Sequence, residues 1–108
     1  MDSLTYFVMN ATADDWESLE QILPQVEAFH GPADFAEIAG VVKRLIDEGL
    51  MEESRRAPID PVSVLADPIE FWFRMTQRGR IEWDAAGEKF RDESLPASQA
   101  PAPNPPKP

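Results

Sequence analysis

Side chains that could carry out chemistry are few and scattered in this sequence. The single histidine, His30, stands in a His-Gly-Pro turn, and there is no cysteine to join it in a metal site. The side chains of the adjacent carboxylates Asp14/Asp15 and Glu52/Glu53 diverge in direction on a helix or strand. This favours ordinary surface charges over a catalytic acid–base pair. No serine lies in a Gly-x-Ser-x-Gly elbow, and every glycine is isolated, so no loop is built to cradle phosphate. We therefore expect no enzyme, no metal and no cofactor.

Basic side chains in the middle of the chain are the candidates for contacts with a partner or with DNA: Lys43, Arg44, Arg55, Arg56, Arg74, Arg78 and Arg80. Lys and Arg supply most of the affinity for duplex DNA because they face its phosphates. Residues 43–80 hold these seven bases and seven acids, whereas residues 1–42 hold eight acids and no base. Arg55 and Arg56 could hold phosphate or an acidic partner, or could only offset Glu52 and Glu53 on a loop. The order of residues does not tell whether the seven bases converge on one face.

Composition limits the class of protein. The chain has 108 residues, 10 basic and 20 acidic side chains, a net charge of -10 and 43% hydrophobic residues, which suits one domain with a real core. The absence of cysteine excludes disulfides and fits a reducing compartment, so we expect a cytoplasmic protein. The apolar runs are far shorter than the roughly 20 residues of a membrane span. Asp2, with no Lys or Arg before the first apolar stretch, is unlike a signal peptide.

The first part of the chain predicts a strand followed by helices. Residues 4–9 are aromatic and β-branched and are typical of a short strand. Thr12 is expected to cap a helix that begins at Ala13, because acidic residues follow in its first turn. Proline is tolerated at a helix start and not in its interior, so Pro24 is expected to begin a second short helix over residues 24–29.

The rest of the chain predicts a long helix, two strands and a last helix. Apolar residues recur on one face from 33 to 48, and Gly49 is expected to end this helix in the left-handed conformation. Residues 50–54 and 69–75 predict antiparallel strands joined by a long, Pro-containing loop without a helical pattern. Thr76 is expected to cap the last helix, in which Gly79 would allow close approach to the sheet. The fold class is thus α+β.

The end of the chain differs in composition. Residues 94–108 hold six of the 11 prolines. We predict one domain over residues 1–92 and a disordered Pro/Ala-rich tail over residues 93–108. Such a tail could bind an aromatic-lined groove or could simply be an exposed terminus.

Two stretches resemble winged-helix domains. Residues 42–51 are similar to the L-x-x-L-x-x-x-G-L end of the third helix, and residues 73–80 to the aromatic-Arg-Leu-Thr-x-x-Gly-Arg junction after the wing in many bacterial members. The resemblance covers about residues 12–92. It implies three N-terminal helices, a strand pair with a Pro-containing wing loop and a C-terminal helix, here preceded by an N-terminal strand. It also implies a binding module without a cofactor, commonly for double-stranded DNA and often dimeric.

The third helix is poorly suited to DNA. If its apolar stripe faces the core, its outward residues include Asp34, Glu37, Gly40, Val41 and Arg44, together with Glu48. In a winged helix the N-terminal part of this helix enters the major groove, where carboxylates oppose phosphate, although Glu can accept a hydrogen bond from cytosine. Gly40 and Val41 would form a small, partly apolar patch suited to another protein.

The aromatic run at residues 71–73 leaves a choice open. Because side chains alternate along a strand, either Phe71 and Phe73 or Trp72 must face away from the core. The outward side is exposed, covered by residues 4–9, or covered by a second subunit, and we expect it to be covered. This surplus of aromatic residues favours a homodimer.

The sequence therefore predicts a non-enzymatic binding module. Its acidic charge favours protein–protein interaction or assembly, with Gly40, Val41 and Trp72 as the interface patch. The alternative is a DNA-binding transcriptional regulator that uses the third helix, the wing and the seven basic residues. Neither reading includes a membrane or a small-molecule substrate.

Overall fold

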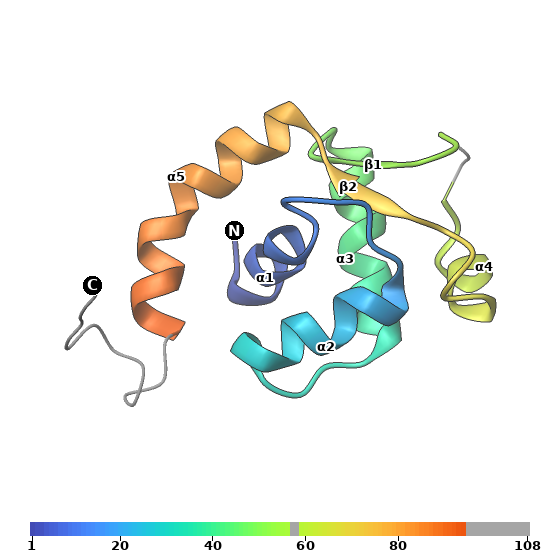
Figure 1. Ribbon diagram of the computed structural model, residues 1–108, viewed down its shortest axis with the longest axis horizontal. Helices are drawn as coiled ribbons and strands as arrows, with labels where there is room; N and C mark the ends of the chain where they lie inside the picture. Colours follow the sequence, from blue (N-terminus) through green and yellow to red (C-terminus); the bar gives the residue numbers. More distant parts are fainter. Residues whose placement is uncertain (57–58, 95–108) are drawn as a thin grey trace.

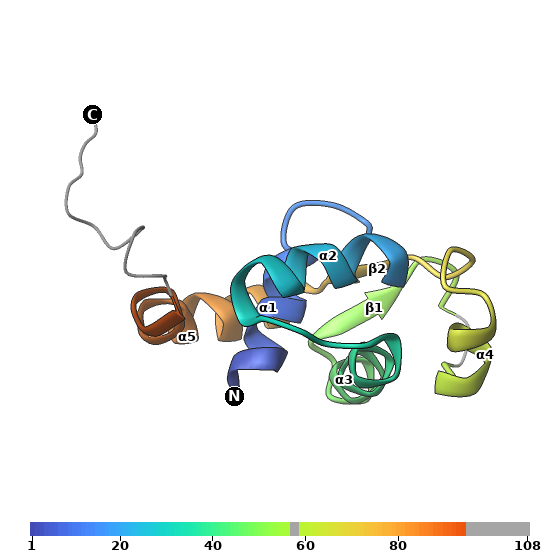
Figure 2. The same ribbon diagram turned by 90° about the horizontal axis from the view of Figure 1, so that it is seen from below.

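The computed structural model describes residues 1–56 and 59–94. Over these residues the fold is α+β, with five helices and one two-stranded antiparallel sheet. In Figure 1, α1 lies at the centre with α2, α3 and α5 around it, and Figure 2 shows α4 at the opposite end of the molecule from α5. The elements are α1 (Ser3–Ala11), α2 (Leu19–His30), α3 (Phe35–Asp47), β1 (Met51–Glu53), α4 (Pro61–Ala66), β2 (Phe73–Met75) and α5 (Gln77–Ser94).

The helix α1 replaces the strand predicted over residues 4–9, so that prediction was wrong. Asp2 caps the helix, because its carboxylate accepts a hydrogen bond from the Thr5 N–H at 2.8 Å. Residues 6–9 are all buried, since α2, α3 and α5 each pack against α1. A helix enclosed in this way needs no polar face, and a short apolar run of this kind cannot be told from a strand by its periodicity.

The start of α2 also differs from the prediction. Thr12, expected to cap a helix from Ala13, instead ends α1, where its hydroxyl donates to the Met9 carbonyl at 3.0 Å. The next helix begins only at Leu19, after the N-cap residue Ser18, whose N–H donates to the Gln21 side chain at 3.1 Å.

Pro24 lies inside α2 and does not begin a new helix. Proline has no N–H to donate to the carbonyl four residues earlier, which is that of Glu20. The helix nevertheless continues, because Leu19, Ile22 and Val26 are completely buried on its inner face while Pro24 itself is exposed. Packing of the apolar face here outweighs the lost hydrogen bond.

The helix α3 agrees with the prediction for residues 33–48. Its N-terminus is closed by a capping box: the Asp34 carboxylate accepts from the Glu37 N–H at 2.8 Å, and the Glu37 side chain accepts from the Asp34 N–H at 3.1 Å. Gly49 follows the helix with φ +77°, the left-handed conformation expected for it.

The strands β1 and β2 pair antiparallel, as predicted, but each is shorter than expected. Met51 lies opposite Met75, and Glu53 lies opposite Phe73. A third segment borders β2 on its other side, where Glu17 and Phe73 exchange two backbone hydrogen bonds of 2.9 and 2.8 Å. The backbone of β2 is therefore paired on both sides.

The loop between the strands contains α4, which the sequence did not predict. Asp60 caps this helix by accepting hydrogen bonds from the Val62 N–H at 3.3 Å and the Ser63 hydroxyl at 3.2 Å. Val64 is buried, and α4 packs against α3. A six-residue helix is too short to show a repeating apolar stripe, which is why the sequence pattern missed it.

The helix α5 begins as predicted. The Thr76 hydroxyl accepts a hydrogen bond from the Gly79 N–H at 3.0 Å and donates to the Gly49 carbonyl at 2.8 Å. Further along, Trp83 and Phe90 stack on Tyr6 of α1, with ring centroids 6.2 and 5.2 Å apart. The helix continues to Ser94, and the rest of the tail predicted over residues 93–108 lies outside the described residues.

Candidate interaction surface

The seven basic residues singled out by sequence are spread over the molecule. Lys43 and Arg44 lie on α3, Arg55 and Arg56 follow β1, Arg74 lies on β2, and Arg78 and Arg80 lie at the start of α5. Three different surface hollows are lined by Arg44, by Arg56, and by Arg74 with Arg80. Each of these three hollows is therefore lined by only part of the basic set.

Carboxylates neutralise two of these cations at short range. The Lys43 ammonium lies 2.6 Å from the Asp47 carboxylate, one turn further along α3. The Arg74 guanidinium lies 3.0 Å from the Glu52 carboxylate across the sheet, and its other face covers the Trp16 ring at 4.3 Å. Exposed ion pairs contribute little to stability, but each one cancels the charge that a distant phosphate would feel.

Arg55 connects the two ends of the loop that contains α4. Its guanidinium lies 2.9 Å from the Glu70 carboxylate and 3.5 Å from the buried carboxylate of Glu53, and it covers the Phe71 ring at 5.0 Å. Its neighbour Arg56 has a φ of 58°, in the left-handed region that few residues other than glycine adopt, and closes the turn after β1. Of the two acids that this pair was expected to offset, Glu53 lies beside Arg55, whereas Glu52 is paired with Arg74.

Arg44, Arg78 and Arg80 join helices to one another. Arg44 donates to the Thr5 hydroxyl of α1, and Arg80 donates to the carbonyl of Ala13. Arg78 donates to the Glu48 carbonyl at 3.0 Å, at the C-terminal end of α3, where the helix dipole favours a cation.

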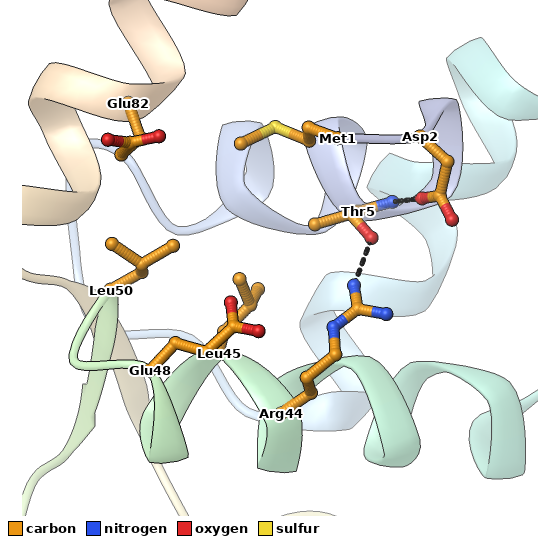
Figure 3. A pocket seen from close by; sticks show the side chains of 8 residues that line it. All are labelled: Met1, Asp2, Thr5, Arg44, Leu45, Glu48, Leu50 and Glu82. Atoms are coloured by element: carbon orange, nitrogen blue, oxygen red, sulfur yellow. Dashed lines mark hydrogen bonds between the residues drawn. The ribbon is translucent and has the colours of Figure 1, made fainter.

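The hollow beside Arg44 has a volume of about 450 Å³ and lies between α1, the end of α3 and the start of α5 (Figure 3). Arg44 points to Thr5 on one side, and the Glu48 and Glu82 carboxylates border the hollow with Asp2. Hydrogen bonds from the Thr5 side chain and N–H lower the pKa of Asp2, and the charge of Arg44 adds to the effect. Three carboxylates around one guanidinium make this hollow unfavourable for phosphate.

The predicted patch on α3 is only partly present. Gly40 is exposed as expected, but Val41 is 8% exposed and does not face outward. Val41 lies three residues before Arg44, on the flank of α3 that faces α1. Because the sequence predicts a strand over residues 4–9, it predicts no helix that would cover this flank of α3.

The run at residues 71–73 places Trp72 outward. Phe73 is completely buried and Phe71 half-buried, whereas Trp72 is 37% exposed. The residues around Phe73, and residues 6–9 of α1, fill the core of one chain. Residues 5–9 are buried, and Trp72 is left partly exposed in the single chain. Covering of Trp72 by a second subunit, and with it the homodimer, stays a prediction.

Trp72 is one of four exposed large apolar residues within residues 62–72, which we together call the α4 surface: Val62 (72% exposed), Leu65 (36%), Ile69 (55%) and Trp72. Of these four residues the sequence predicts only Trp72 as part of an interface, because it predicts a Pro-containing loop without a helix between residues 54 and 69. The signal was available in Asp60-Pro61, which is a helix start, followed by apolar residues one turn apart.

Comparison of the chain with protein-family models, with curated proteins and with solved structures found no match in any of the three. Within the described residues, no group of three or more His, Cys, Asp or Glu side chains is placed to hold a metal ion. Nor does this part of the chain contain a helix long and apolar enough to cross a membrane.

Proposed function

We propose that this chain is a winged-helix module that binds another protein and carries out no catalysis. The order of elements supports the fold assignment: three helices, a strand pair joined by a long loop, and a closing helix. The isolated backbone bridge between Glu17 and Phe73 lies between α1 and α2 in the chain, where a winged-helix domain has a short strand of its sheet. In this scheme α3 is the third helix and residues 54–72 are the wing, which here carries α4.

The observation that carries the proposal is that most of the seven basic side chains bind to other groups of the same chain. Six of the seven bases make hydrogen bonds or ion pairs to neighbouring groups, and Lys43, Arg55 and Arg74 are paired with carboxylates. A protein that neutralises DNA phosphates needs such side chains free to replace counterions. Bases already compensated by acids supply little attraction for a phosphate backbone.

The beginning of α3 supports the same conclusion. Asp34 and Glu37 are exposed at its N-terminus and hold each other in the capping box, so both carboxylates are fixed where a DNA-reading helix would meet the groove. The chain as a whole has a net charge of -10, which repels a polyanion.

The proposal is tested by fluorescence anisotropy with a labelled random-sequence duplex at about 50 and 200 mM salt. We expect no binding by the wild-type chain at concentrations on the order of 100 μM, the weak end of non-specific DNA binding. Binding that falls steeply with salt, and that is abolished by Arg55→Glu/Arg56→Glu, would instead establish the DNA-binding regulator, the alternative favoured by the seven bases.

A second variant tests the reason for the expected result. Glu52→Gln/Glu70→Gln removes the carboxylate that pairs with Arg74 and the nearer of the two carboxylates that pair with Arg55. If ion pairing is what silences these bases, this variant should bind the duplex measurably at about 50 mM salt and lose that binding at about 200 mM. Glu20→Gln/Glu27→Gln makes the same change in net charge on two acids of α2 that form no ion pair with the seven bases within the described residues, and it should have no such effect.

A further inference from the structure

We propose that the α4 surface is the docking site for a partner segment whose apolar side chains are flanked by Lys and Arg, an inference that rests on the proposed function. Seven large apolar side chains are exposed among the described residues, and four of them form the α4 surface between residues 62 and 72. Isolated exposed apolar residues are ordinary, but such a concentration on one short segment is typical of an interaction site.

The α4 surface is held in shape by contacts beneath it. Val64, on the inner side of α4, is 1% exposed, and α4 packs on α3. On the other side, Arg55 lies over the Phe71 ring and binds Glu70 at 2.9 Å. A partner therefore meets a surface that is already formed, and binding does not require the loop to be ordered first.

Acids border this surface. Asp60 precedes α4, Asp67 follows it, and Glu70 lies before Trp72. Glu70 is paired with Arg55, whereas Asp60 and Asp67 have no cationic partner within residues 1–56 and 59–94. The nearby Arg56 lines a different hollow, beside Ile46 and β1. An apolar centre with an acidic border is complementary to an apolar segment with basic borders.

The charge also argues against a second copy of this chain as the occupant. In a two-fold symmetric dimer the same patch faces itself, so Asp60 and Asp67 of both copies would approach each other. Each copy also carries a net charge of -10, and this repulsion opposes association. Because Val62 and Leu65 lie one helical turn apart, they form a ridge against which the apolar stripe of an amphipathic helix can pack.

The test uses a synthetic amphipathic peptide of about 18 residues, with Leu on one face, Lys on its borders and Ala elsewhere. It is titrated into the ¹⁵N-labelled full chain, with affinity from calorimetry and location from amide chemical shifts. We expect shifts around α4 and β2, and at least tenfold weaker binding of a matched peptide with Glu in place of Lys.

Two variants locate the site. Val62→Ser/Leu65→Ser removes two exposed apolar side chains and should weaken peptide binding by about tenfold or more. Ile81→Ser is the matched control, because Ile81 is 63% exposed but lies on α5, and it should bind like the wild type. Circular dichroism verifies that both variants are folded.

Other outcomes overturn the inference. Absence of peptide binding, equal affinity of the wild type and Val62→Ser/Leu65→Ser, or shifts confined to the hollow beside Arg44 would each refute it while leaving the proposed function standing. A dimer in sedimentation that Val62→Ser/Leu65→Ser dissociates would show that a second copy occupies the surface. Salt-sensitive binding of random-sequence duplex DNA would instead refute the proposed function itself.

Discussion

The backbone of α5 comes close to that of Leu50, the residue before β1, at Gly79, and replacing this glycine by alanine tests the packing directly. A Cβ at position 79 would lie 2.0 Å from the Leu50 carbonyl oxygen and 2.9 Å from the Met75 Cγ. The first of these neighbours is backbone, so no side-chain rotation can relieve the contact. The helix α5 must move away from Leu50 by more than about 1 Å to accept the methyl group.

That movement has a definite cost. It weakens the hydrogen bond from the Thr76 N–H to the Leu50 carbonyl, 3.1 Å long, and the bond from the Thr76 hydroxyl to the Gly49 carbonyl, 2.8 Å long. Two such hydrogen bonds contribute about 2 kcal/mol, and overpacking adds about 1–3 kcal/mol. Alanine recovers about 1 kcal/mol through its helix propensity. We expect Gly79→Ala to lower the free energy of unfolding by about 2–4 kcal/mol.

The control is Gly40→Ala, at an exposed glycine in the interior of α3. Apart from the neighbouring residues and backbone of α3 itself, no heavy atom lies within 4 Å of a Cβ at position 40. This variant should gain about 0.5–1 kcal/mol, because an exposed glycine in a helix interior is replaced by the best helix former.

Urea unfolding followed by tryptophan fluorescence, and thermal unfolding followed by circular dichroism, measure both variants. For a domain of this size about 1 kcal/mol shifts the melting temperature by about 4–8 °C, so Gly79→Ala should melt at least about 8 °C below the wild type and Gly40→Ala a few degrees above it. A Gly79→Ala variant as stable as the wild type would refute the close packing of α5 on Leu50.

Three further substitutions test the ends and the interior of the first two helices. Asp2→Ala removes the cap on Thr5 and should cost about 1 kcal/mol at pH 7. Folding lowers the pKa of Asp2 below 3.8, so the benefit of the cap is present above that pH and is lost as the pH falls through the folded-state pKa; the urea midpoints of variant and wild type should converge as the pH is lowered below 3.8. Burial raises the pKa of Glu17 above 4.5, so ionised Glu17 opposes folding at neutral pH, and Glu17→Gln should raise the urea midpoint at pH 7 but not near pH 4. Pro24→Ala supplies an N–H to the Glu20 carbonyl and should raise the free energy of unfolding by about 1 kcal/mol, whereas an unchanged or lower value would mean that the proline is not strained in α2.

The elements that could be predicted from the sequence are those whose local signals agree. For α3, the apolar stripe and Gly49 indicate the same boundaries, and the structure adds the capping box of Asp34 and Glu37. For α5, the Thr76 cap and the small Gly79 indicate both its start and its contact with the sheet. Capping residues near the ends of these helices set their boundaries, and the apolar stripe sets which face packs against the core.

The elements that could not be predicted depend on contacts between distant segments. Residues 3–11 form a helix and not a strand because three other helices pack around them. The helix α2 continues through Pro24 because its inner face is buried. Val41 was assigned outward because helix periodicity gives the centre of an apolar stripe reliably but not its edges. Whether an edge residue is buried depends on which element lies beside it, and here that element is α1.

The spatial arrangement of the charges also could not be predicted from the sequence, and it bears on the function. Residues 43–80 hold equal numbers of bases and acids, and a count along the chain leaves open whether they separate into a positive and a negative face. In the fold, Arg74 pairs with Glu52, 22 residues away, and Arg55 with Glu70, 15 residues away. These two pairs join residues that are distant in sequence, and only the antiparallel strands and the loop bring them together. The excess acids of residues 1–42 are not offset by this segment, so the field around the protein is negative. A partner drawn to such a field is basic, which is the chemistry inferred for the α4 surface.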